Sequence, residues 1–254
     1  MSPLRVLRGL IFGAIGGLIG WILIEQLPLG PAFQPWRYEG PHSVQPVIST
    51  GDQAMLGVAL GLAIGGCLGI AEGMGEGTVS RFRRTLLAFL GLGALGGMIG
   101  LYFGQTFFAI MHGKTNPGDI GVSDFLPQLL ARSMGWMLLG LFLGVVFGVS
   151  NMSFRRAWNG ALGGAIGGAL GGFVFQVLAY AGFGGNKLRL LGFVILGAAI
   201  GFFINLVAEV MKQVWVKVLI GRNEGREYVL DTPLAYVGRD ELAQIPVFLD
   251  PAVP

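Results

Sequence analysis

The chain carries one eight-residue frame three times, and each copy lies inside a long apolar run. The frame has glycine at its first, fourth, fifth and eighth positions and occurs at residues 13–20, 93–100 and 160–167. Arginines stand shortly before each copy, and a second apolar run with regularly spaced glycines follows each one. The repeat unit is therefore predicted to be a pair of hydrophobic helices, and three pairs give six helices.

The composition places these helices in a membrane. Of the 254 residues, 53% are hydrophobic and 12% are charged, with a mean hydropathy of +0.69. Soluble domains carry about 25% charged residues, so this apolar surplus exceeds what one aqueous core of this size can bury. The net charge of +3 is too small to indicate a nucleic-acid partner. The first expected partner is the lipid bilayer.

Six stretches are long enough to cross a bilayer, because a spanning helix needs about 20 mainly apolar residues. They lie near residues 10–27, 54–71, 86–111, 129–149, 157–181 and 188–211. The predicted fold class is an all-α integral membrane domain over residues 1–212, built from three glycine-zipper helix-pair repeats at about 5–72, 81–150 and 155–211. A short β-rich segment, residues 213–254, follows it.

Lysine and arginine predict the orientation, because they are enriched in cytoplasmic loops. The side that holds the amino terminus carries Arg5, Arg8, Arg81, Arg83, Arg84, Arg155, Arg156, Lys212 and Lys217. The opposite side carries fewer, namely Arg37, Lys114, Arg132, Lys187 and Arg189. The bias sharpens if Arg132 snorkels out of the fourth span on its long stem. We expect both termini in the cytoplasm of a bacterium and the protein in its inner membrane.

Glycines recur at every fourth position within several spans. Such spacing places them in one groove along a helix, where a neighbouring backbone can approach closely. The expected helix-packing residues are Gly13, Gly17, Gly57, Gly61, Gly65, Gly69, Gly93, Gly97, Gly140, Gly144, Gly148, Gly160, Gly164, Gly168 and Gly172. The same grooves would also suit an oligomer or another membrane subunit, or the lining of a conduction path.

Polar residues gather at the ends of the spans rather than at mid-depth, which argues against a hydrophilic path. Glu25 and Gln105 stand at equivalent positions of two repeats, and Gln176 lies one turn further in the third. The simple interpretation is interfacial anchoring and ion pairing. A proton or cation site built from these three residues is the sharper alternative.

The sequence predicts a protein without enzymatic activity. Residues 91–96 match a dinucleotide-binding fingerprint, but they lie inside a membrane span and lack the strand that this motif requires. His42 and His112 fall on different loops without further ligands at metal-binding spacing, and Cys67 is the single cysteine. We expect no catalytic residues, no metal and no cofactor.

The pattern changes after Met211 to an alternation of apolar residues over 214–219, which is typical of a strand. Further β-prone pieces occur at 227–230, 235–237 and 247–249. Residues 225–230 (Gly-Arg-Glu-Tyr-Val-Leu), 236–240 (Tyr-Val-Gly-Arg-Asp) and 245–253 (Ile-Pro-Val-Phe-Leu-Asp-Pro-Ala-Val) carry a familiar pattern. This pattern resembles the amino-terminal part of a forkhead-associated (FHA) domain.

The resemblance implies a β-sandwich that binds phosphothreonine peptides. By position, Gly238 would support the binding loop and Arg239 would contact the phosphate. The expected function is a membrane anchor or accessory subunit that presents this module in the cytoplasm, with other membrane subunits and a phosphothreonine protein as partners. The alternatives are a structural subunit of a larger membrane complex without phosphate recognition, and a channel or transporter for an ion or small solute.

Overall fold

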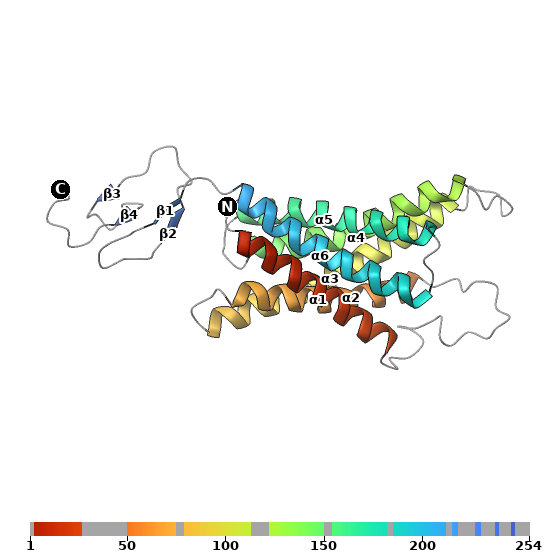
Figure 1. The fold of residues 1–254 in the computed structure, drawn as a ribbon, viewed down its shortest axis with the longest axis horizontal. Coiled ribbons are helices and arrows are strands. Elements are labelled where there is room, and N and C mark those ends of the chain that lie inside the picture. Colours follow the sequence, from red (N-terminus) through yellow and green to blue (C-terminus); the bar gives the residue numbers. More distant parts are fainter. Residues whose placement is uncertain are drawn as a thin grey trace. The chain divides into compact units, whose positions relative to one another are not determined.

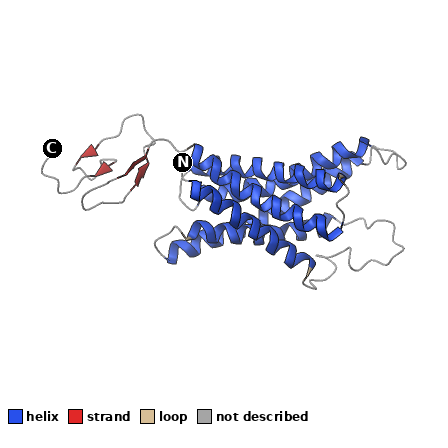
Figure 2. Cartoon of the chain, viewed as in Figure 1, coloured by secondary structure: helices blue, strands red, loops and turns tan. Residues whose placement is uncertain are grey.

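The structure is a computed structural model with two compact units, Met1–Glu209 and Val210–Pro254. It describes residues 3–26, 50–74, 79–112, 122–149, 154–181, 185–211, 215–217, 227–229, 237–238 and 245–246. Helices make up the described part of the first unit, and short strands occur in the second (Figure 2). The boundary lies within three residues of the predicted change at 212/213.

The structure describes six long helices in the first unit, drawn as coiled ribbons in Figure 1. They are α1 (Pro3–Glu25), α2 (Thr50–Gly73), α3 (Val79–His112), α4 (Val122–Val149), α5 (Phe154–Tyr180) and α6 (Gly185–Val210). Each one is long and apolar enough to cross a membrane. The prediction of an all-α membrane protein with six spanning helices is therefore confirmed at this level.

The helices are longer than their apolar stretches. Helix α3 begins at Val79, ahead of the predicted start at residue 86. The prediction followed hydropathy and left out the first turns of the helix, because they are polar and arginine-rich. Helix α4 begins at Val122 and continues through Pro127, ahead of the predicted start of this span at residue 129. A proline near a helix start removes a single backbone hydrogen bond, close to the turn whose N–H groups have no helical partner in any case.

The helices form a ring in chain order, and α6 closes it against α1. At each of the six junctions, a methyl group added to a glycine would overlap backbone atoms of the next helix. The junctions are Gly16 with Ile64, Gly61 with Gly93, Gly100 with Gly135, Gly144 with Gly160, Gly167 with Ala199, and Gly197 with Gly13. Neighbours run antiparallel, since residue numbers rise on one helix as they fall on the other.

The three copies of the repeated frame make equivalent contacts in this ring. The first and fifth glycines of each frame face the preceding helix: Gly13 and Gly17 face α6, Gly93 and Gly97 face α2, and Gly160 and Gly164 face α4. The fourth and eighth face the following helix: Gly16 and Gly20 face α2, Gly96 and Gly100 face α4, and Gly163 and Gly167 face α6. Each frame therefore gives its helix two small-residue surfaces, where we had predicted one groove.

The remaining predicted packing glycines also lie on defined surfaces. Those of α2 face α3, and those of α5 face α4. The positions concerned are Gly57, Gly61, Gly65 and Gly69 in α2, and Gly168 and Gly172 in α5 beyond the frame. Gly140 and Gly144 of α4 face α5, whereas the surroundings of Gly148 lie outside the described residues. Mutual glycine contacts thus join α2 to α3, α4 to α5 and α6 to α1, which belong to different predicted helix pairs. Gly100 and Gly135 also join α3 to α4, within one predicted pair.

Large apolar side chains fill the inside of the ring. The Leu143 side chain of α4 reaches towards Gly65 of α2 and Gly93 of α3, and Leu68 of α2 reaches Gly201 of α6. The fully buried core includes Leu60, Ile64, Phe89, Leu139, Leu143, Val146, Leu196, Ile200 and Ile204. Other large apolar side chains, such as Ile11, Phe103 and Ile166, are exposed on the outside. This outer surface suits contact with lipid.

Four short strands are described in the second unit. β1 (Trp215–Lys217) pairs antiparallel with β2 (Glu227–Val229), with Trp215 opposite Val229. β3 (Val237–Gly238) pairs parallel with β4 (Ile245–Pro246). The first three overlap predicted strands, whereas the predicted strand at 247–249 lies outside the described residues.

Candidate functional site

Buried polar side chains in the bundle gather at its two ends. The Glu25 end is where α1, α3 and α5 finish and α2, α4 and α6 begin, and the Glu72 end is the opposite one. Glu25 and Gln176 are buried at the first, and Thr85, Asn205 and Glu209 at the second. The two ends differ in the space that they enclose.

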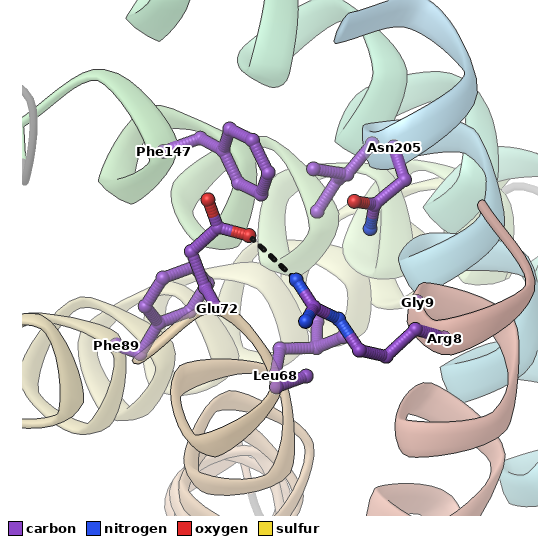
Figure 3. Close-up of a pocket in the computed structure, with 9 residues that line it drawn as sticks. Arg8, Gly9, Leu68, Glu72, Phe89, Phe147 and Asn205 are labelled. Atoms are coloured by element: carbon purple, nitrogen blue, oxygen red, sulfur yellow. Dashed lines mark ion pairs between the residues drawn. The ribbon is translucent and has the colours of Figure 1, made fainter. Parts of the chain in front are cut away.

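The Glu72 end holds only a small cavity, and Figure 3 shows the residues that line it. Arg8 of α1 and Glu72 of α2 point toward one another, with Nη2 of Arg8 4.0 Å from the carboxylate, and Nη2 of Arg5 lies 3.9 Å from the same group. The amide of Asn205 donates a hydrogen bond to the carbonyl oxygen of Gly201 at 2.9 Å. The cavity among these residues measures about 10 Å³, which holds no more than one water molecule.

The Glu25 end contains a half-open cavity of about 490 Å³. Five helices contribute to its wall, α2 to α6. Apolar residues such as Leu56, Leu60, Leu101 and Phe193 form part of it. Its polar members are Gln105, Gln128, Arg132, Trp136, Gln176 and Arg189. This volume lies within the range of small-molecule sites, about 300–1,000 Å³.

Helix α4 supplies three of the polar wall residues. Gln128, Arg132 and Trp136 are spaced by four, so they share one face of the helix. The Arg132 guanidinium lies 4.7 Å from the centroid of the Phe175 ring, a cation–π distance. Its Nη1 atom is buried and has no hydrogen-bond partner among the described residues. Snorkelling of Arg132 to the surface, the condition under which the charge bias would sharpen, is therefore not what the structure shows for this group.

Two further polar atoms of the wall are buried without a described partner. They are Nε1 of Trp136 and Oε1 of Gln176, whose residues are 5% and 3% exposed. The amide nitrogen of Gln176 does have a partner, since Nε2 donates a hydrogen bond to Oε1 of Gln128 at 3.0 Å. A buried polar group without a partner costs about 1–3 kcal/mol, so this wall is poised for a ligand or ordered water.

Glu25 lies beside the cavity wall rather than in it. It accepts a hydrogen bond from Nε of Arg189, and the two form an ion pair between α1 and α6. The indole N–H of Trp21 donates to Asn186 at 2.7 Å and joins the same two helices. Glu25 is 6% exposed, whereas the Arg189 side chain is 27% exposed, so solvent screens this pair only in part.

The structure brings together two of the three residues of the hypothetical proton or cation site. Gln105 and Gln176 line the cavity, whereas Glu25 is paired with Arg189. Sequence reasoning missed Gln128, Trp136 and the inward position of Arg132. The signal was present in the four-residue spacing of these polar side chains inside an otherwise apolar run.

The other predicted site residues are only partly described. Gly238 belongs to strand β3, and Arg239 lies outside the described residues. His42 and the His112 side chain lie outside them as well.

No family model matches the chain, and neither a curated protein nor a solved structure is significantly similar to it.

Proposed function

We propose that this protein is a non-catalytic membrane anchor or accessory subunit whose bundle presents the FHA-like segment, residues 213–254, in the cytoplasm. The observation that carries the anchoring role is the filled interior of the ring, where Leu143 and Leu68 reach across to neighbouring helices. An apolar core at mid-depth supports an anchor over a conducting channel, because an ion path requires polar groups there.

The close glycine contacts are the means by which the bundle holds together in lipid. Helices in a bilayer gain nothing from escaping water, so association depends on close packing and interhelical hydrogen bonds. We assign this glycine-zipper role to the three equivalent frames and attribute their equivalence to three repeated helix pairs. The outward apolar surface is the region where other membrane subunits would bind.

The phosphopeptide-binding role depends on Arg239. A planar guanidinium can hold a phosphate through two parallel hydrogen bonds, which explains why arginine suits this position. Full-length protein in detergent is expected to bind a phosphothreonine peptide library, and the Arg239→Ala variant to bind at least about tenfold more weakly, since a hydrogen bond to a charged group contributes about 1.5–3 kcal/mol. Fluorescence anisotropy with labelled peptides measures this affinity.

Arg222→Ala is the matched control, because it removes the same charge from the tail outside the FHA-like pattern. Unphosphorylated peptides should bind neither variant nor the wild type. If the intact chain shows no preference for phosphorylated peptides, the phosphopeptide role is wrong, and the structural subunit remains.

The orientation can be tested with one thiol. A Cys67→Ala background removes the single native cysteine, and Pro254→Cys then places a thiol at the end of the tail. We expect a membrane-impermeant maleimide to label this thiol only after the cells are opened. Labelling of intact cells would place the tail outside and exclude a cytoplasmic phosphopeptide reader.

A further inference from the structure

We propose that the cavity at the Glu25 end binds an anionic amphiphile, with its phosphate or carboxylate at Arg132 and Trp136 and its apolar body against the leucine and phenylalanine wall. This site is independent of the tail. It requires only the helices of the first unit, so it can be tested separately from phosphopeptide binding.

The cavity wall carries positive charge, which favours an anionic ligand. Arg132 and Arg189 both line the cavity, and the Glu25 carboxylate is bound to Arg189. Arg132 lies within the candidate span Phe125–Phe147, roughly 10 Å along the helix from Phe125 at 1.5 Å per residue. A guanidinium at that depth is costly unless an opposite charge or a polar cavity receives it. The ring of Phe175 offsets only part of this cost.

The hydrogen-bonding groups point to the same chemistry. Nη1 of Arg132 and Nε1 of Trp136 are donors, and both are buried without a partner in the described part of the chain. Phosphate and carboxylate oxygens are acceptors that would satisfy both donors once the two side chains turn towards the ligand. Oε1 of Gln176 is an acceptor, so it matches a hydroxyl on the same ligand.

The size of the cavity argues against a bare inorganic anion. A cavity of about 490 Å³ has room for many waters or for a molecule of considerable length. Leu56, Leu60 and Leu101 give it an apolar side that a phosphate ion would leave uncovered. An acid with an alkyl chain covers both parts of the wall. Such a ligand comes either from the bilayer as an acidic lipid or from solution as a free acid.

The test uses the full chain in phosphatidylcholine nanodiscs with dodecyl phosphate as the probe. Saturable binding is expected to raise the Tm of the wild type, while inorganic phosphate at the same concentration leaves it unchanged. Arg132→Gln should weaken binding at least tenfold. Arg83→Gln is the matched control, because Arg83 is an exposed arginine of α3 remote from the cavity wall, and its affinity should equal that of the wild type.

A second variant keeps the test decisive if Arg132→Gln fails to fold. Gln176→Glu places a carboxylate in the wall that holds Arg132. We expect this variant to be more stable than the wild type without a ligand and to lose dodecyl phosphate binding, because the protein then supplies the anion itself. A purely structural role for Gln176 does not predict that combination.

The source of the ligand is decided by lipid extraction from protein purified out of native membranes. If the source is the bilayer, the wild type carries an acidic lipid that the Gln176→Glu variant lacks. If the source is soluble, both carry the same lipids and only the wild type binds dodecyl phosphate. The proposal is overturned if the wild type shows neither bound acidic lipid nor saturable binding, which means that water alone fills the cavity. It is also overturned if inorganic phosphate stabilises as strongly as dodecyl phosphate.

Discussion

Alanine in place of Gly97 is expected to destabilise the bundle by about 3 kcal/mol, near the upper end of the usual cost of overpacking. The added methyl group would overlap the carbonyl group of Gly57, whose carbon atom would lie 2.6 Å from the methyl carbon. The obstacle is backbone, so no side chain can rotate aside, and α2 would have to move away from α3. Unfolding of the purified protein in a detergent and denaturant series, followed by circular dichroism, measures the loss.

Gly91→Ala is the matched control in the same helix. A methyl group at Gly91 meets nothing within 4 Å, and alanine favours helix formation over glycine by up to about 1 kcal/mol. This variant should therefore be as stable as the wild type or slightly more stable. Equal stability of Gly97→Ala and Gly91→Ala would mean that α2 and α3 do not approach closely at this level, and the close-packed ring would be wrong.

The same comparison tests the equivalence of the three frames. Gly17 and Gly164 occupy the fifth position of their frames, as Gly97 does, and a methyl group at either would also overlap a backbone carbonyl group. Their alanine variants should lose about as much stability as Gly97→Ala, within a factor of two to three that local context usually introduces. A large loss at one frame alone would argue against three equivalent helix pairs.

The spans could be predicted from sequence because hydropathy and length are local properties of each segment. The helix-packing glycines could be predicted in part, since spacing by four defines a groove whatever its occupant. The second surface of each frame, which includes Gly16, Gly96 and Gly163, was missed. Which helices become neighbours depends on how six helices close into a ring. The residues of a frame such as 13–20 do not indicate that α6 will lie beside it.

The polar residues show the same limit more sharply. Glu25 and Arg189 are 164 positions apart, so their pairing could not be inferred from spacing. Arg132 was counted with the outer charges because it stands near the start of the fourth predicted span, 129–149. Its rotation into the ring follows from the contacts of α4 with α3 and α5, through Gly135, Gly140 and Gly144. The cavity is thus a property of the assembled bundle.

Removal of the Glu25 carboxylate is expected to have the second large effect on stability. Glu25→Leu removes the carboxylate that pairs with Arg189 between α1 and α6, and loss of one member of a largely buried pair costs up to about 3 kcal/mol. Glu72→Leu is the matched control, because Arg5 and Arg8 lie 3.9 and 4.0 Å from the Glu72 carboxylate, at the outer limit of an ion pair, and such loose pairs contribute roughly 0–1 kcal/mol. Exchange of the two charges, Glu25→Arg with Arg189→Glu, should recover most of the loss in the same unfolding assay.

The Glu25 variant also links the ion pair to the cavity. Without the carboxylate, the positive charge of Arg189 adds to that of Arg132 in the same wall, so Glu25→Leu should bind dodecyl phosphate more tightly than the wild type although it is less stable. Added ligand should then restore more stability to the variant than to the wild type, because the stabilisation by a ligand that binds the folded state grows with the logarithm of its concentration relative to its Kd. If Glu25→Leu is no less stable than Glu72→Leu, the pair contributes nothing beyond a surface contact. If its affinity for dodecyl phosphate falls, the charge of Arg189 does not act on the ligand.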